Sequence, residues 1–278
     1  MDLASYFSRI GYAGSRSPTL ATLNAIVARH VESIPFENLD ILLGRPISIE
    51  LPAIADKLVG RRRGGYCFEN NTLLLHVLEA LGFEVTALSA RSRYRRPERY
   101  TLPRTHVFLR VALDGESHLV DVGFGGLSLT AALRLAADAR QETPHEPRRL
   151  VREGSWDGFE RRAPDAVLVH QAHFADAWHD LYEFTLEVMP PVDREMGNWY
   201  TSAHPRSHFR DHLMVARSTA DGRVTLQDRE LTWRRGDGSS TSRILATHDE
   251  LLTVLAEDFQ LSFPGDARFE CPALSGLL

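Results

Sequence analysis

One cysteine stands at a position that suits a nucleophile. Cys67 lies in the segment Arg63-Gly64-Gly65-Tyr66-Cys67-Phe68-Glu69-Asn70, where two glycines let the backbone turn sharply. The apolar spacing that follows, ended by Gly82, predicts a helix over residues 67–81. Cys67 would then occupy the first helical turn, where free N–H groups and the positive dipole end favour a thiolate and can hold an oxyanion. The alternative for such a cysteine is a buried, inert thiol.

A nucleophilic cysteine needs a base, and a hairpin supplies a candidate. Asp114-Gly115 is a strong hairpin turn, and with that turn residues 106 and 123 face each other, as do residues 108 and 121. His106 and Asp121 then lie diagonally on one face, about 7–8 Å apart at the backbone, within reach of an imidazole–carboxylate hydrogen bond. Such a carboxylate fixes the tautomer of the base. The chain has twelve histidines, so the hairpin geometry singles out His106.

The surrounding pattern predicts helices first and strands afterwards. Ser17-Pro18 is expected to start a helix that runs to about Val31, a second helix is expected over residues 52–59, and the third carries Cys67. After Phe83, strand patterns cover residues 85–92, 106–113, 118–122 and 182–188, and residues 137–164 are expected to hold loops. A second hairpin at Asp221-Gly222 and a capping box at residues 247–250, before a helix over 251–258, complete an α+β pattern.

Composition narrows the class of protein. A chain of 278 residues with a net charge of −5 predicts about two domains and argues against a dedicated nucleic-acid binder. Lys57 is the only lysine, which disfavours Schiff-base chemistry. Two cysteines far apart disfavour a disulfide scaffold, and no apolar run predicts a membrane span. The N-terminus lacks the pattern of a signal peptide, so we expect a cytoplasmic location.

Three other motifs are weaker candidates for chemistry. His204, His208 and His212 have metal-ligand spacing, but Pro205 interrupts the helix that they would need, and we expect no metal. Ser155 misses the Gly-x-Ser-x-Gly pattern of serine hydrolases by one position. Cys271 has no inferred base and is expected to be structural.

Four blocks of the sequence carry a family resemblance. The block around Cys67, Thr105-His106-Val107, Val120-Asp121-Val122-Gly123-Phe124-Gly125 and Pro35-Phe36-Glu37-Asn38 resemble the signature motifs of the arylamine N-acetyltransferases, in order and spacing. Cys67, His106 and Asp121 fall on that family's catalytic triad. The resemblance covers essentially the whole chain.

The resemblance implies three domains: a helical domain over residues 1–85, a β-barrel over 86–190 and an α/β lid over 191–278. The first two are similar to the core of cysteine proteases. It further implies a ping-pong reaction in which Cys67 takes an acetyl group from acetyl-CoA and passes it to an aromatic amine or hydrazine. By the same resemblance, acceptor-pocket candidates are Phe36, Phe124 and Phe209, and CoA-binding candidates are Gly125, Gly126, Tyr200, Arg206 and Ser207. Glu37 and Arg63 are candidates for a salt bridge near the site, or for a solvated pair.

Two other enzymatic functions share this triad. Amide synthases that close a macrolactam from a carrier-bound acyl chain resemble the family closely. A papain-like or transglutaminase-like hydrolase is also compatible with the order Cys, His, Asp. No nucleic-acid or membrane partner is expected.

Overall fold

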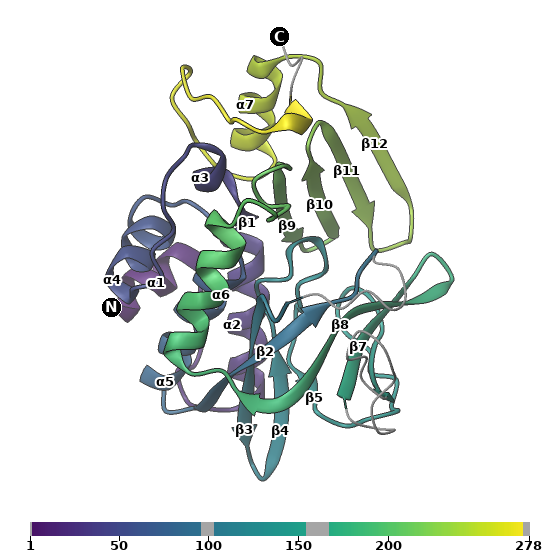
Figure 1. Ribbon diagram of the computed structural model, residues 1–278. Helices are drawn as coiled ribbons and strands as arrows, with labels where there is room; N and C mark the ends of the chain where they lie inside the picture. The colour runs from purple at the N-terminus through teal and green to yellow at the C-terminus, as the bar shows by residue number, and fades with distance from the viewer. Residues whose placement is uncertain (1, 96–102, 154–166, 275–278) are drawn as a thin grey trace.

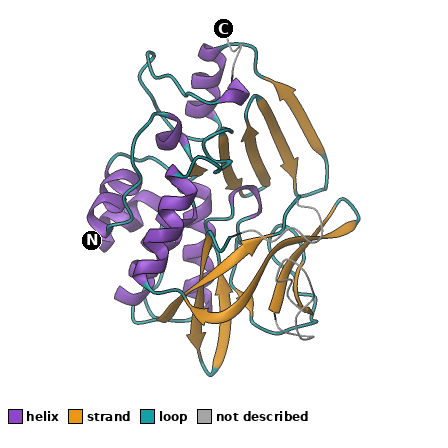
Figure 2. Ribbon diagram, in the orientation of Figure 1, coloured by secondary structure: helices purple, strands orange, loops and turns teal. Residues whose placement is uncertain are grey.

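The computed structural model of the protein describes residues 2–95, 103–153 and 167–274. Helices gather on one side of the molecule and two β-sheets on the other (Figures 1 and 2). This arrangement confirms the predicted α+β class. The predicted domain boundaries stay a prediction, and Ser155 lies outside the described residues.

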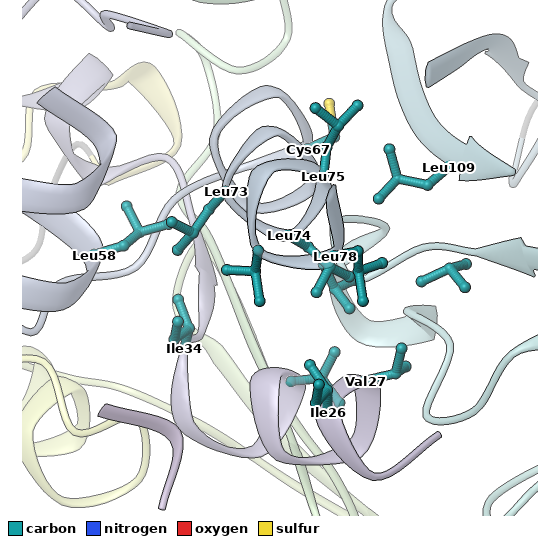
Figure 3. Close-up of a cluster of buried hydrophobic side chains, with 14 of the residues drawn as sticks. Ile26, Val27, Ile34, Leu58, Cys67, Leu73, Leu74, Leu75, Leu78 and Leu109 are labelled. Carbon is teal, nitrogen blue, oxygen red and sulfur yellow. The ribbon is translucent and has the colours of Figure 1, made fainter. Parts of the chain in front are cut away.

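The N-terminal helical part buries the helix that carries Cys67. Its elements are α1 (Leu3–Ile10), α2 (Leu20–Ser33), α3 (Leu39–Leu42), α4 (Leu51–Ile54), a π-helix η1 (Ala55–Gly60) and α5 (Cys67–Ala80). Leu74 and Leu78 of α5 point toward Ile26 and Val27 of α2 (Figure 3), and all four are fully buried. These contacts fix α5 in the core. Because its later turns are packed against α2, the first turn, which carries Cys67, is also held in place.

Local chemistry explains where these helices differ from the prediction. The predicted start of α2 at Ser17-Pro18 is wrong by two residues, because Thr19 is the extended N-cap and its Oγ1 accepts from the N–H of Thr22 at 3.2 Å. The second predicted helix is divided into α4 and η1. Helix α1 was not predicted, although Asp2 caps it.

A seven-stranded antiparallel sheet positions His106 and Asp121. Its strands are β2 (Glu84–Ser92), β3 (His106–Leu113), β4 (Glu116–Val120), β5 (Leu133–Arg134), β6 (Arg148–Glu153), β7 (Val167–Phe174) and β8 (Ala177–Val188), in the order β5-β4-β3-β2-β8-β7-β6. Ala137 and Gln141, just beyond β5, bridge to β6 at the other edge. The sheet therefore curls into a nearly closed barrel. Residues 137–164 were expected to hold loops; the structure also places β6 there.

The predicted hairpin between β3 and β4 is confirmed. Leu113 pairs with Glu116 across the Asp114-Gly115 turn, and the ladder ends where Leu109 pairs with Val120. Asp121 is the first residue beyond β4, so the chain turns away there and no longer follows the strand. A short 3-10 helix, η2 (Gly125–Leu127), follows.

A five-stranded sheet forms the upper part of the molecule in Figure 1. It has the order β1-β9-β10-β11-β12, with β1 (Phe36–Glu37), β9 (Met214–Thr219), β10 (Gly222–Gln227), β11 (Glu230–Arg235) and β12 (Ser240–Ile244). Helix α6 (Pro191–Ala203) precedes β9 in the chain, and α7 (His248–Glu257) and η3 (Pro272–Leu274) follow β12. Thr247 caps α7 as predicted. The second hairpin turns at Ala220-Asp221, one residue earlier than predicted, because Gly222 already pairs with Thr219.

Strand β1 links the segment before Cys67 to strand β9. Phe36 pairs with Ala216 of β9 and bridges to Gly65, two residues before Cys67. Asn38, the residue that follows β1, donates from its side chain to the carbonyls of Phe209 and His212, both at 2.7 Å. Its side-chain oxygen accepts from the N–H of Met214 at 2.8 Å. The segment before the nucleophile is therefore fixed by residues far along the chain.

A buried ion cluster links the two sheets. Glu146 accepts from Arg223 of β10 at 2.7 Å and also contacts Arg148 of β6. Burial alone would raise the pKa of Glu146, but the charges of the two arginines lower it to about 2. The carboxylate is therefore ionised over the physiological range and holds the sheets together.

No helix in the part of the chain that the structure describes is long and apolar enough to cross a membrane.

Candidate active site

Cys67 is the first residue of α5. Its N-cap neighbour Tyr66 is extended, and the backbone N–H of Tyr66 donates to the Glu69 carboxylate at 3.1 Å. The Cys67 side chain points away from Ile26 and Val27 beneath the helix (Figure 3), and its Sγ lies 3.7 Å from the carbonyl oxygen of Thr105. The thiol therefore faces β3 from a helix start whose first N–H groups have no intrahelical acceptor.

Gly123 lets the loop after β4 approach this cysteine. A Cβ atom at position 123 would lie 2.6 Å from Cys67 Cα and 2.7 Å from the side-chain nitrogen of Asn71. Any other residue there would push the loop from α5, and Asp121 with it. The glycine accordingly sets the spacing between the nucleophile and the carboxylate.

His106 and Asp121 are hydrogen bonded as the hairpin predicts. His106 Nε2 lies 2.7 Å from Asp121 Oδ2, and both residues are buried. Asp121 Oδ1 accepts from Asn71 Nδ2 and from the Gly123 N–H, each at 3.0 Å. With Nε2 engaged, Nδ1 is the imidazole nitrogen left for the thiol.

The electrostatics of the site favour a protonated imidazole. Burial alone would lower the pKa of His106, but the charge and hydrogen bond of Asp121, together with Cys67, raise it to about 10. An imidazolium beside Cys67 stabilises a thiolate there. The arrangement is thus equipped for nucleophilic attack and for proton transfer to and from a leaving group.

Two further residues support the site and were not predicted. Asn71 donates to the Val107 carbonyl at 2.8 Å and accepts from the Val122 N–H at 3.1 Å, which ties α5 to β3 and to the loop after β4. Its position four residues after Cys67 places it on the same helix face, which was a usable signal. The ring of Tyr182 packs on His106 with centroids 4.9 Å apart.

The three predicted phenylalanines are partly buried; Phe124 contacts the triad, whereas Phe36 and Phe209 lie beside the residues that precede Cys67. Phe124 packs edge-on against His106 at 5.0 Å. The ring centroids of Phe36 and Phe209 lie 6.3 Å apart, and those of Phe209 and Tyr66 lie 5.7 Å apart. Their role in holding an acceptor stays a prediction.

The predicted CoA-binding residues form two groups. Gly125 and Gly126 open η2, and a Cβ at Gly126 would lie 2.6 Å from Thr225 Cγ2, so this loop packs closely on β10. Tyr200 lies on α6, and Arg206 is exposed in the segment after it. Ser207 is buried, and its hydroxyl donates to the Thr201 carbonyl. The geometry leaves these roles as predictions.

The predicted salt bridge between Glu37 and Arg63 is confirmed. Arg63 Nη2 lies 2.8 Å from Glu37 Oε1, and both side chains are buried, so the pair is not solvated. Arg61 and Arg62 are exposed. Within the described ranges no group of three or more His, Cys, Asp or Glu side chains forms a metal site.

Comparisons with known proteins identify the family. The N-acetyltransferase family model matches residues 19–268. The arylamine N-acetyltransferase of Mycolicibacterium smegmatis is 48% identical over 247 residues, which cover 87% of this chain and 86% of the relative. A solved structure of M. smegmatis arylamine N-acetyltransferase has a TM-score of 0.87 at 44% identity, with 94% and 93% of the two chains covered. The Mycobacterium marinum arylamine N-acetyltransferase, solved in complex with CoA, has a TM-score of 0.85 at 40% identity, with 93% and 92% covered. With its Cys, His and Asp arranged as described above, the chain belongs to the arylamine N-acetyltransferase family and is an acyltransferase.

Proposed function

We propose that the protein transfers an acetyl group from acetyl-CoA to the nitrogen of an aromatic amine or hydrazine, through an acetyl-Cys67 intermediate. The observation that supports this is the buried chain of contacts at the start of α5, with His106 bonded to Asp121 at 2.7 Å beside the thiol. The names of the relatives and the CoA complex of the M. marinum protein support the substrate classes.

In the first half-reaction the Cys67 thiolate attacks the carbonyl carbon of the acetyl thioester. The carbonyl oxygen gains the negative charge, which the free N–H groups in the first turn of α5 can stabilise. The bond between the carbonyl carbon and the CoA sulfur then breaks. His106 gives its proton to the departing CoA thiolate, and acetyl-Cys67 remains.

In the second half-reaction the amine nitrogen attacks the acetyl-Cys67 carbonyl carbon. His106, now neutral, accepts the proton that the nitrogen must lose as the new C–N bond forms. The bond to Cys67 Sγ breaks, and the thiolate and imidazolium are restored. Asp121 stays ionised and holds the imidazole in one orientation throughout.

The substrate contacts belong to the same proposal. Phe36, Phe124 and Phe209 would line the acceptor pocket, where aromatic rings suit an aryl group. Gly125 and Gly126 would offer backbone N–H groups to CoA, with Tyr200, Arg206 and Ser207 as further contacts. The cytoplasmic location is proposed as well, because a reducing compartment preserves the thiol.

Intact-protein mass spectrometry tests the mechanism. The protein is mixed with acetyl-CoA and no amine, beside Cys67→Ala and, as a matched control, Cys271→Ala, which removes the only other cysteine. We expect one acetyl group on the wild type and on Cys271→Ala, and none on Cys67→Ala. The acetyl group should be lost when aniline is added. Acetylation that persists in Cys67→Ala would refute the intermediate. If Cys67 is alkylated readily but takes no acetyl group, the donor is not acetyl-CoA, and carrier-bound acyl chains should be tested.

A further inference from the structure

A cluster of five buried ionic side chains lies directly beside the segment that carries Cys67. Its centre is Lys57 of η1, the only lysine in the chain, whose side chain is 7% exposed. Lys57 Nζ lies 2.8 Å from Glu69 Oε1, 2.9 Å from Asp40 Oδ2 and 3.9 Å from Glu37 Oε1. A lysine is rarely buried unless it is paired, so this arrangement calls for a reason.

Glu69 connects the cluster to the nucleophile. Its Oε1 contacts Lys57, whereas its Oε2 accepts from the Tyr66 N–H at 3.1 Å and so caps the start of α5. A Cβ at Gly65 would lie 2.7 Å from Glu69 Oε2, so the glycine makes room for this cap. Glu69 stands two residues after Cys67, in the first turn of α5.

An uncompensated carboxylate at that place would oppose the reaction. A negative charge in the first turn favours the helix, but it disfavours a second negative charge on the neighbouring sulfur. One unit charge at about 5–10 Å, in an effective dielectric constant of about 20, shifts a pKa by roughly one to two units. Glu69 would thus cancel much of what the helix start and His106 contribute.

The other charged groups around Cys67 are already engaged. Arg63 Nη2 contacts Glu37 Oε1 at 2.8 Å and Asp40 Oδ1 at 3.3 Å, and on the opposite side of the thiol His106 is bonded to Asp121. Within the described part of the chain, Lys57 is the only cation in contact with Glu69. The compensation of Glu69 depends on this one side chain.

We propose that Lys57 is a positioning residue for the nucleophile: it neutralises Glu69, which can then cap α5 without opposing the negative charge on Cys67 Sγ. This inference rests on the proposed role of Cys67. Burial alone would lower the pKa of Lys57, but the three carboxylates raise it above its usual value, so the ammonium stays charged. Burial raises the pKa of Glu69 above its usual value even beside Lys57, which shows how costly that carboxylate is without a partner.

The pH dependence of Cys67 alkylation tests this role. All variants carry Cys271→Ala, so that iodoacetamide reports on one thiol, and the rate is measured from pH 4 to pH 10. Lys57→Met keeps the length of the side chain and removes its charge. We expect it to raise the midpoint of alkylation by about one to two pH units. Glu69→Gln keeps an acceptor for the Tyr66 N–H and should shift the midpoint to lower pH. The double variant should return to within about half a unit of the starting protein.

Three results would overturn the proposal. The first is an unchanged midpoint in Lys57→Met. The second is a raised midpoint that Glu69→Gln does not restore, since the effect would then come from disturbed packing. The third is a raised midpoint in Glu69→Gln alone, which decides the matter even if Lys57→Met does not fold. Alkylation needs neither acetyl-CoA nor an amine, so this test can fail while acetyl transfer stands, and the reverse.

Discussion

Replacing Asp121 with asparagine changes one oxygen of the site and has a derivable effect. Asp121 Oδ1 accepts two N–H groups, from Asn71 and Gly123, whereas Oδ2 faces His106 Nε2. The amide oxygen of asparagine must therefore take the Oδ1 position, which leaves the NH2 group facing Nε2. Nε2 then has to accept, and the imidazole proton moves to Nδ1. That is the nitrogen that should receive the proton of the Cys67 thiol.

The size of the loss follows from the pKa of His106. Its surroundings raise this pKa from 6.5 to about 10: burial is the largest single cause and lowers the pKa, but the charge and hydrogen bond of Asp121, together with Cys67, more than offset it. Without that charge the pKa falls to 6.5 or lower, a change of at least about 3.5 units. The equilibrium for proton transfer from the thiol to the imidazole weakens by the same factor, roughly 3,000-fold. We expect acetylation of Cys67 at pH 7 to slow by about a thousandfold.

Single-turnover acetylation by acetyl-CoA, quenched and followed by mass spectrometry, measures this rate. Asp114→Asn is the matched control, since it makes the same chemical change at the exposed turn of the same hairpin, and it should stay within about twofold of the wild type. Thermal unfolding of both variants establishes that they fold. A folded Asp121→Asn protein that acetylates within tenfold of the wild type would show that His106 does not depend on this carboxylate.

Three further predictions concern the scaffold. Glu146→Gln should lower the free energy of unfolding by about 3 kcal/mol at pH 7, since the folded pKa of about 2 lies below the usual 4.5. That stabilisation is present above pH 4.5 and lost as the pH falls toward 2. The free energy of urea unfolding should therefore differ less between pH 7 and pH 2.5 in the variant than in the wild type. A loss of stability under about 1 kcal/mol in the variant at pH 7 would contradict the link between the sheets. Gly123→Ala should slow single-turnover acetylation by about 10² because the new Cβ meets the backbone of Cys67, while near-ultraviolet circular dichroism stays native; an unchanged rate would show that the loop yields freely. Leu78→Ala should cost about 2–5 kcal/mol in urea unfolding, and a cost below 1 kcal/mol would mean that α5 is not fixed through α2.

The triad was predictable because each part of it follows from a local pattern. The Asp-Gly turn sets the register of one hairpin, and that register brings Asp121 out of β4 close to His106 at the start of β3. A glycine pair before an apolar helix places Cys67 at a helix start. The start of α2 was not predictable in the same way, because Ser17 and Thr19 are both good N-caps, and only the structure selects Thr19.

Apart from the Glu37–Arg63 pair, the charge cluster could not be predicted from sequence. Lys57, Glu69 and Asp40 are residue types that normally face water, and helical spacing alone gives them no reason to be inside. They are buried because α5 is covered on several sides, by α4, β2 and β3, and by α2 through the contact of His30 with Asn70. Burial on every face removes the amphipathic pattern from which a polar support residue would be recognised.

The place of β1 has a consequence for how the protein is made. The segment Phe36-Glu37-Asn38 lies between Gly65 on one side and β9 on the other. The Glu37 N–H donates to the Gly65 carbonyl at 2.9 Å, and the Gly65 N–H donates to the Pro35 carbonyl at 3.2 Å. During synthesis β1, which holds the nucleophile loop at Gly65, leaves the ribosome about 180 residues before its β9 partners do. The loop therefore takes its final form only when synthesis is nearly finished. A nascent chain released early would carry the thiol without the contacts that β9 makes with this segment.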